Sequence, residues 1–290
     1  MNVKKVYPYW LIILPITTFF IFLVLPSTIG YLYAFTDWNP FVHEISFVGL
    51  ANFKEIVQNR SLMLAFQNTM IIAFVKTVTV TVVGIALAVM LDRKIRTRNI
   101  LRSIYFTPAI FSALVVGLIF AGLFDDRNGV INTTLRDIGL DMLALEWLGR
   151  RWPAMFVINL AEIWRSLGYS IVITLAALQS IPSDYIDAAR VDGANGWQRF
   201  RQITLPLIMP AVNVNILFSL IYGLKMFDLV MVLTSGGPGF ETQTFGTLIM
   251  AQMARNRYAQ SVAINLVWSA ILIVVAILFQ KYSSKWEADI

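Results

Sequence analysis

Residues Ile181 to Pro206 read IPSDYIDAARVDGANGWQRFRQITLP, a polar and charged segment between two long apolar runs. Pro182 starts a short predicted helix, and Ser183 or Asp184 is expected to cap its positive dipole end. Gly193 lies where a left-handed residue would end that helix. The segment is therefore predicted to be a short helix, a glycine turn and a second amphipathic stretch.

Two features of this segment make it a candidate docking element. Ala188 and Ala189 keep one face of the predicted helix thin, so that the surface of another protein can approach closely. Trp197, Phe200 and Ile203 recur at helical spacing and are expected to seat the second stretch against membrane spans. The periodicity alone fits an inert connector between spans equally well.

The chain as a whole is too apolar for a soluble domain. Of its 290 residues, 58% are hydrophobic and 14% are charged, and the mean hydropathy is +0.69, whereas soluble domains carry roughly 25% charged residues. An all-α integral membrane protein is therefore predicted. Cysteine is absent and His43 is the only histidine, which excludes disulfide scaffolds and argues against the usual zinc or iron ligand sets. No catalytic residue, metal site or cofactor is predicted in this chain.

Six apolar runs reach the length of about 20 residues that a helix needs to cross a membrane. The first run follows Lys4 and Lys5 and has no signal-peptide cleavage site after it, so it is expected to be a retained span. The six predicted spans are Tyr9–Tyr33, Thr69–Leu91, Ser103–Phe124, Pro153–Leu178, Leu207–Thr234 and Tyr258–Gln280.

Basic residues predict the orientation of these spans. The short loop DRKIRTRNILR between spans two and three carries five basic residues, and such a loop belongs in the cytoplasm. Both termini and the 181–206 segment are then cytoplasmic, in agreement with the Lys4/Lys5 and Lys281/Lys285 pairs. The basic excess and the pI of about 9.6 thus report topology and not a nucleic-acid partner. The five basic residues of the loop are Arg93, Lys94, Arg96, Arg98 and Arg102.

Three segments are expected to face outward, at 34–68, 125–152 and 235–257. They carry eight basic residues over a much greater length, although Arg150 and Arg151 count weakly against this orientation. In the first segment, a glycine turn and apolar residues at helical spacing in ISFVGLANFKEIV predict a short interfacial helix. In the second, NGVINTTLRDIGL predicts a helix that follows an Asn-Gly turn and has one apolar face.

The third outward segment, TSGGPGFETQT, cannot continue a helix through its glycines and proline. A tight loop is one interpretation, and a contact site for an external binding protein is the other. The residues that would face such a protein are Gly236, Gly237 and Pro238.

A few ionisable residues interrupt the spans, where a buried charge is costly unless it is paired or hydrated. Two acid–base pairs have a spacing of three residues, so each pair can meet on one helix face, and a tyrosine lies near each pair. One interpretation is a polar cavity that binds hydroxyl groups. The other is that each pair neutralises itself within its helix, or that Lys225 and Lys76 reach toward the outer surface. The candidates for the translocation path are Glu162, Arg165, Tyr169, Tyr222, Lys225 and Asp228.

The sequence DAARVDGANGWQRFRQITLP closely resembles the EAA loop of permease subunits in binding-protein-dependent ABC importers. Asp187 stands where many members have glutamate; this keeps the charge but shortens its reach, so the resemblance makes an ionic contact to an ATPase plausible without assuring it. The positions that match the ATPase-coupling motif are Asp187, Ala188, Ala189, Asp192, Gly193 and Ala194, followed by Phe200, Ile203, Leu205 and Pro206.

Three further motifs, FVGLANF, LAALQSIP and LTSGGPG, are similar to the carbohydrate branch of these importers, the maltose and glycerol-phosphate type. The resemblance covers residues 47–240 and implies a six-helix type I importer domain with a cytoplasmic coupling helix. The implied division is an N-terminal helix and first outer segment at 1–65, the importer domain at 66–282 and a cytoplasmic tail at 283–290.

The resemblance also implies partners. It predicts a second homologous permease subunit, a cytoplasmic ABC ATPase dimer that binds ATP and magnesium, and an extracellular or periplasmic protein that delivers a sugar. The expected location is the plasma membrane of a bacterium or archaeon. The chain contains no G-x-x-x-x-G-K-[ST] phosphate loop, so energy must come from another chain or from an ion gradient.

Two other classes of protein fit the sequence less well. A secondary, ion-coupled transporter commonly shows repeats with matched broken helices, and no convincing repeat is present here. An intramembrane enzyme would need a nucleophile or metal motif such as G-x-S-x-G or H-E-x-x-H, and neither occurs in the sequence.

Overall fold

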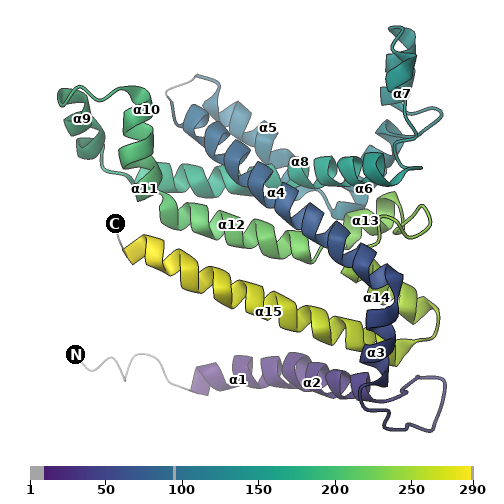
Figure 1. Ribbon diagram of the computed structural model, residues 1–290. Coiled ribbons are helices and arrows are strands. Elements are labelled where there is room, and N and C mark those ends of the chain that lie inside the picture. Colours follow the sequence, from purple (N-terminus) through teal and green to yellow (C-terminus); the bar gives the residue numbers. More distant parts are fainter. Residues whose placement is uncertain (1–9, 94–95, 289–290) are drawn as a thin grey trace. The chain divides into compact units, whose positions relative to one another are not determined.

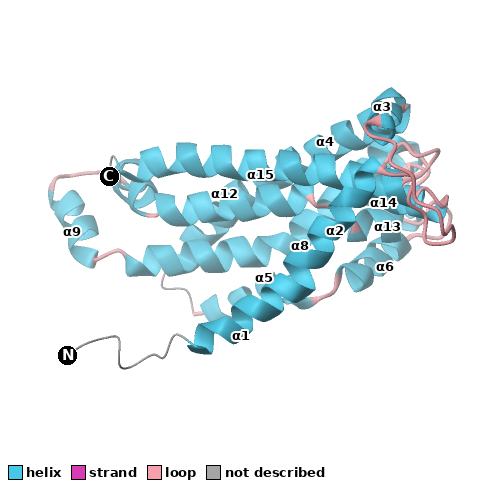
Figure 2. Ribbon diagram, turned by 90° about the horizontal axis from the view of Figure 1, so that it is seen from below, coloured by secondary structure: helices cyan, strands magenta, loops and turns pink. Residues whose placement is uncertain are grey.

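The computed structural model describes residues 10–93 and 96–288, with side chains as far as Ser283. Lys4, Lys5 and Lys94 lie outside the described residues, as does the side chain of Lys285. The described residues form helices joined by loops, without a strand (Figures 1 and 2). The all-α prediction is therefore confirmed.

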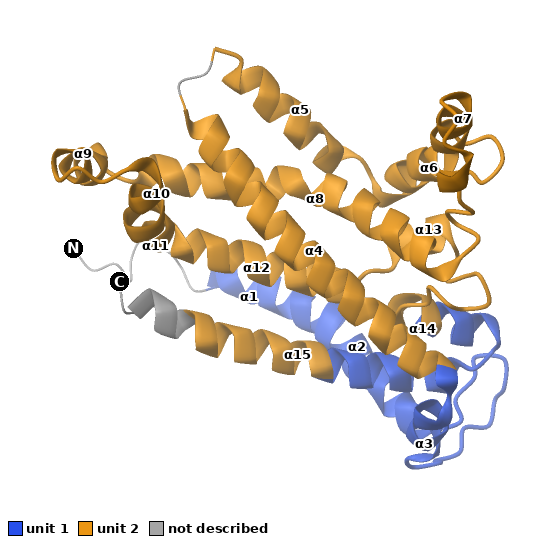
Figure 3. Ribbon diagram, turned by 45° about the horizontal axis from the view of Figure 1, so that its top comes forward, with its two compact units in different colours: residues 1–60, 249–270 blue, residues 61–248, 271–290 orange. Residues whose placement is uncertain are grey.

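The chain divides into two compact units (Figure 3). Unit 1 comprises Met1–Arg60 and Ile249–Ala270, and unit 2 comprises Ser61–Leu248 and Ile271–Ile290. The first elements are α1 (Trp10–Phe19), η2 (Phe20–Val24), α2 (Leu25–Leu32), η3 (Tyr33–Phe35) and α3 (Ala51–Gln58). The next are α4 (Arg60–Asp92), α5 (Arg98–Ile110), α6 (Ala113–Leu123), α7 (Val130–Asp137), η4 (Asp141–Leu143) and α8 (Arg151–Ser180). The last are α9 (Ser183–Val191), α10 (Gly196–Arg199), η5 (Phe200–Thr204), α11 (Leu205–Leu207), α12 (Met209–Leu224), α13 (Asp228–Leu233), α14 (Phe245–Ala254) and α15 (Tyr258–Ala288).

Four helical stretches within the described residues are long and apolar enough to cross a membrane, and two bent pairs raise the number to as many as six. The four are Trp10–Phe35, Arg60–Asp92, Arg151–Ser180 and Tyr258–Ser283. They confirm predicted spans one, two, four and six as continuous helical segments, within a few residues at most ends.

Predicted spans three and five are not straight. Helices α5 and α6 meet at 98°, and the α10–α11 segment meets α12 at 70°. Ser112 lies in the first break, where its hydroxyl accepts a hydrogen bond from the amide of Val115 and caps α6. The prediction that span five continues to Thr234 is wrong, because α12 ends at Leu224 and a separate helix begins at Asp228.

Unit 1 is joined by polar contacts between its two sequence segments. The hydroxyl of Tyr31 donates to Ser269, and the guanidinium of Arg257 pairs with Glu55 at 3.0 Å. Asn52 is buried and donates to the carbonyls of Ala34 and Thr36, which fixes the start of α3. The predicted helix after Gly49 is therefore confirmed as α3, while its place at the membrane interface stays a prediction.

Unit 2 holds two apolar core clusters formed mainly by α4, α6, α8, α12 and α13. Close helix approach requires glycine at one crossing in particular. A Cβ atom added to Gly223 would lie 2.6 Å from the Cα of Ala73, so α12 and α4 meet nearly backbone to backbone there. Helices α7 and α9 lie at opposite ends of unit 2 (Figures 1 and 3).

Candidate functional site

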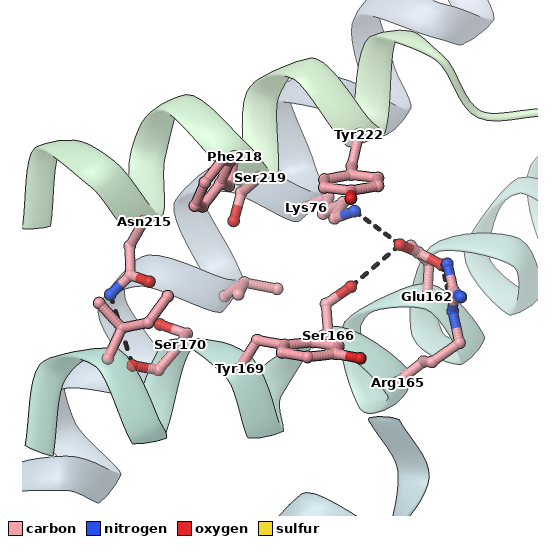
Figure 4. Close-up of a pocket in the computed structure, with 12 residues that line it drawn as sticks. Lys76, Glu162, Arg165, Ser166, Tyr169, Ser170, Asn215, Phe218, Ser219 and Tyr222 are labelled. Carbon is pink, nitrogen blue, oxygen red and sulfur yellow. Dashed lines mark hydrogen bonds and ion pairs between the residues drawn. The ribbon is translucent and has the colours of Figure 1, made fainter. Parts of the chain in front are cut away.

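A cavity of about 340 Å³ lies among α4, α8 and α12 inside unit 2 (Figure 4). Among the described residues, no group of three or more His, Asp or Glu side chains is placed to hold a metal ion. The cavity wall offers hydroxyl, amide, charged and aromatic side chains. It is lined by Lys76, Val80, Glu162, Arg165, Ser166, Tyr169, Ser170, Ile173, Asn215, Phe218, Ser219 and Tyr222.

The structure brings together four of the six residues predicted for the translocation path. Glu162, Arg165, Tyr169 and Tyr222 line this cavity. The other two residues are Lys225 and Asp228, which do not line it and are exposed. The prediction that this pair meets on one helix face is wrong, because the break after Leu224 separates the two residues.

A buried ionic cluster forms one wall of the cavity. The ammonium of Lys76 on α4 lies 2.6 Å from Oε1 of Glu162 on α8, and both side chains are almost fully buried. Arg165 donates from Nε and Nη2 to Oε2 of Glu162, and Ser166 donates to Oε1. The carboxylate therefore accepts four hydrogen bonds, and the cluster keeps one excess positive charge.

This cluster corrects one interpretation of the sequence. Glu162 and Arg165 do pair within α8, as their spacing of three residues predicted. The alternative that Lys76 reaches toward the outer surface is wrong, because its ammonium is buried against Glu162. A pair between residues 86 positions apart leaves no signal in local spacing.

Aromatic rings and amides complete the cavity wall. The ring of Tyr222 lies 5.4 Å from the Lys76 ammonium, within the range of a cation–π interaction. Tyr169 donates to the carbonyl of Ala109, which orients its ring. Asn215 on α12 donates to the hydroxyl of Thr174 at 2.9 Å on α8. Such a surface offers ring faces and both donors and acceptors to a hydroxyl-rich molecule.

Several lining residues were missed from the sequence, and a helical repeat could have found those on α8 and α12. On α8, polar and aromatic side chains recur every three or four positions, which places them on one face. On α12, the same spacing joins Asn215, Ser219 and Tyr222. The residues that the structure adds to the cavity wall are Lys76, Val80, Ser166, Ser170, Ile173, Asn215, Phe218 and Ser219.

The segment that resembles the EAA loop folds into an exposed short helix, α9. The carboxylate of Asp187 pairs with Arg190 one turn later at 2.7 Å, and both side chains are about 60% exposed. Ala188 is exposed, whereas Ala189 is buried against this chain. Of the two alanines predicted to thin the docking face, only Ala188 is therefore available to another protein.

Helix α9 ends in the glycine turn that the sequence predicted. Gly193 has φ +78°, its amide donates to Arg190, and the amide of Ala194 donates to Ala189. These are the two bonds of a Schellman motif, and the following Asp192–Ala194 turn is exposed or half-buried. The predicted cap by Ser183 or Asp184 is wrong, because the helix begins at Ser183 itself and no side chain caps it.

The second stretch of the segment departs from its predicted packing. Asn195 and Gln198 form a reciprocal capping box that starts α10. Trp197 is 67% exposed and contacts only the ring of Phe200 among the aromatic residues described. The prediction that Trp197 seats this stretch against the spans is therefore wrong, whereas Phe200 and Ile203 are half-buried.

The outward segment with Gly236, Gly237 and Pro238 is a tight loop. The hydroxyl of Thr242 donates back to the carbonyl of Gly237 at 2.6 Å. Buried Asn68 on α4 donates to the carbonyls of Glu241 and Gln243, which ties the loop to α4. The loop interpretation is confirmed, and a contact with a binding protein stays a prediction.

Known proteins resemble this chain in both sequence and fold. The family model described as "Binding-protein-dependent transport system inner membrane component" matches residues 80–287. The multiple sugar-binding transport system permease protein MsmF of Streptococcus mutans is 31% identical over 99% of this chain and 100% of its own length. The probable starch degradation products transport system permease protein AmyD of Thermoanaerobacterium thermosulfurigenes is 33% identical over 94% of both chains.

A solved structure agrees with these sequence matches. The chain superposes with a TM-score of 0.84 and 25% identity on a bacterial ABC transporter involved in the import of the acidic polysaccharide alginate. The match covers 96% of this chain and 94% of the other. The chain, with its bent spans and the segment that contains α9, therefore has a fold that a known transporter also has.

Proposed function

This chain belongs to the family of binding-protein-dependent transport system inner membrane components, and on that premise we propose that it imports a sugar or oligosaccharide as the permease subunit of an ABC importer. The relatives with 31% and 33% identity carry names that refer to sugars and starch degradation products. One observation in the structure carries the proposal: a polar, aromatic-lined cavity lies between α4 and α8, each long enough to span a membrane, and α12, which belongs to a bent pair that could span it.

The cavity suits a carbohydrate for chemical reasons. Arg165 and Ser219 offer hydrogen-bond donors, and the hydroxyl oxygen of Ser219 and the amide oxygen of Asn215 can accept. The rings of Tyr169, Phe218 and Tyr222 are each more than half exposed, and flat apolar faces match the C–H faces of a sugar ring. In this proposal those side chains form this chain's share of the translocation path.

ATP hydrolysis is assigned to a separate chain. The phosphate-loop motif is missing from the sequence, and the exposed helix α9 resembles the loop that receives an ATPase in such importers. In this proposal α9 and the following turn insert into the ATPase dimer, which binds ATP and magnesium, and Asp187 and Gly193 belong to the contact. A second, homologous permease completes the path.

The proposed orientation follows from the positions of the two ends of unit 2. Helix α9 lies at one end and α7 at the other (Figure 3), and basic residues near the α4–α5 turn favour the α9 end as cytoplasmic. Helix α7 and the loop of Gly236, Gly237 and Pro238 then face the external binding protein. The proposed location is the plasma membrane of a bacterium or archaeon, with both termini inside.

Reconstitution in proteoliposomes tests this function. The permease is combined with the ATPase, second permease and binding protein encoded beside it, and uptake of a radiolabelled oligosaccharide is measured. We expect uptake that requires ATP and the binding protein and is unaffected by ionophores. Uptake that persists without the ATPase and collapses with the ion gradient would instead identify a secondary transporter.

A further inference from the structure

The cavity in unit 2 carries an excess of positive charge. Three of the twelve residues that line it are charged at neutral pH, namely Lys76, Glu162 and Arg165. Two cations and one carboxylate leave a net charge of +1. Figure 4 shows this ionic cluster at one end of the cavity and Asn215 at the other. An unbalanced charge at membrane depth is costly unless a counter-charge or water reaches it.

The carboxylate of the cluster has no free acceptor site for a ligand. Oε1 of Glu162 accepts hydrogen bonds from Lys76 and Ser166, and Oε2 accepts two from Arg165. An ionised carboxylate has about four acceptor sites, so the protein itself uses all of them. The side chain of Glu162 is also only 1% exposed. A ligand in the cavity therefore meets no available negative charge from this cluster.

One of the two cations remains open to a ligand. The ammonium of Lys76 is buried between Glu162 and the ring of Tyr222. The side chain of Arg165 is 27% exposed, and its hydrogen bonds within the described residues use Nε and Nη2 and leave Nη1 without an acceptor. Nη1 and the second N–H of Nη2 form a planar fork that matches the two oxygens of an acid group. The excess charge is therefore offered to a ligand through Arg165.

The surrounding helices do not balance this charge. Lys225 and Asp228 follow α12, do not line the cavity and carry opposite charges. Helix α5, which packs against α8, adds only basic residues, and α6 adds no charge. Helix α12 has no charged residue, and the remaining charges of α4 and α8 stand at helix ends, on Arg60, Asp92 and Arg151. Asp92 is roughly 24 Å along α4 from Lys76, too far to pair with the cluster.

The excess charge discriminates among saccharides by their own charge. A neutral sugar leaves the charge of the cluster uncompensated. An amino sugar brings another cation toward Arg165, and like charges repel strongly away from bulk water. A phosphate monoester carries a charge of about −1.5 to −2 at neutral pH, which is more than the cluster balances. A single carboxylate matches the excess of one positive charge.

We infer that this cavity selects an acidic saccharide, built from uronic acid units, and that one carboxylate of the sugar pairs with the free fork of Arg165. The rings of Tyr169 and Tyr222 then contact the apolar faces of the sugar, and the amide oxygen of Asn215 accepts from a hydroxyl group at the other end. The inference rests on the proposed function, because it assigns a substrate class to the same cavity.

The test measures binding in the cavity without the external binding protein. In the complete importer in nanodiscs, Phe218→Cys is labelled with an uncharged maleimide, and the sugar concentration that halves the labelling rate of this chain is determined. The probes are uronic acid disaccharides of gluco, galacto and manno configuration, each paired with its carboxyl-reduced neutral form. In at least one pair the acid should protect at a concentration about tenfold lower or less. Arg165→Gln should abolish this difference, and Arg165→Lys, which keeps the charge, should retain part of it.

A cation outside the cavity supplies the matched control. Lys225→Met should leave the preference for the acid unchanged, because Lys225 does not line the cavity. Equal protection by the acid and neutral forms of every pair, or protection by neither, would overturn the inference. A preference that survives Arg165→Gln would overturn it too, as would stronger protection by the corresponding sugar phosphates. The proposed function fails on a different result, namely that the importer with its binding protein takes up no saccharide in an ATP-dependent manner.

Discussion

The ammonium of Lys76 lies 2.6 Å from the carboxylate of Glu162 and joins α4 to α8 beside the cavity. Removal of one partner of such a buried pair leaves an uncompensated charge and typically costs about 3–5 kcal/mol. Glu162→Gln should destabilise the permease more than Lys76→Met, because it leaves both Lys76 and Arg165 without their carboxylate. Thermal unfolding of the purified permease in detergent measures the difference.

The double variant provides the control for this prediction. Lys76→Met combined with Glu162→Gln should be less destabilising than the sum of the two single changes, because the two residues interact directly. Strictly additive losses in midpoint temperature would contradict a coupled pair.

The cavity predicts a contrast between two cations. Arg165 lines the cavity and its side chain is 27% exposed, whereas Lys225 lies beyond the end of α12 and outside it. Arg165→Met should raise the KM of uptake by about tenfold, which corresponds to one hydrogen bond from a charged group. Lys225→Met should leave uptake unchanged. Co-purification of the ATPase should be normal in both variants, and equal effects of the two changes on KM would argue against this cavity as the path.

The turn after α9 predicts a contrast between two glycines. Gly193 has φ +78°, a conformation that costs a residue with a Cβ about 1–2 kcal/mol. Gly196 has open space around it and no positive φ. Gly193→Ala should lower ATP-driven uptake while the permease still inserts, and Gly196→Ala should not. Measurement of uptake per hydrolysed ATP distinguishes loss of coupling from loss of protein, and equal ratios for both variants would count against a coupling role.

The charge of α9 gives a separate test of the same helix. Asp187→Lys places a like charge beside Arg190 and reverses the charge offered to the ATPase. Uptake should fall while the amount of inserted permease stays constant. Asp184→Lys, at the start of the same helix, supplies the matched change outside the motif. Normal uptake in the Asp187→Lys importer would reject an ionic contact at this position.

The crossing of α4 and α12 predicts a folding defect. A Cβ atom at Gly223 would lie 2.6 Å from the Cα of Ala73, so Gly223→Ala forces the two helices apart. Gly122 on α6 has no atom within 4 Å of the same added Cβ. Gly223→Ala should lower the yield of folded permease and its midpoint temperature, and Gly122→Ala should change neither. Gel filtration in detergent with a thermal scan compares them.

The sequence predicted the features that depend on local pattern. Four spans, the helix after Gly49 and the left-handed turn at Gly193 follow from apolar run length and glycine position, which act over a few residues. The pairing of Glu162 with Arg165 follows from helical spacing in the same way. The formation of these elements depends on neighbouring residues in the sequence and not on contacts with distant parts of the chain.

Other features depend on parts of the chain that meet only in three dimensions. Lys76 pairs with a residue on another helix, so its spacing gave no indication of burial. The 98° bend at Ser112 interrupts a run without a charged residue from Ser103 to Phe124, and mean hydropathy carries no information about a change in helix direction. Trp197 had the spacing of a buried residue but lies on a short segment with little chain to pack against.

The most direct test asks whether the cavity is a water-filled path during transport. The chain has no cysteine, so Phe218→Cys, at an exposed position in the cavity wall, introduces a single thiol. Val82→Cys, exposed on α4 but outside the cavity, is the control. A cationic thiol reagent is added to the reconstituted importer, and the rate of labelling of each thiol is measured with and without ATP and sugar. The account predicts labelling at position 218 that changes with ATP and slows with sugar, and no such dependence at position 82. Labelling at position 218 that is absent, or unaffected by both ATP and sugar, would contradict it.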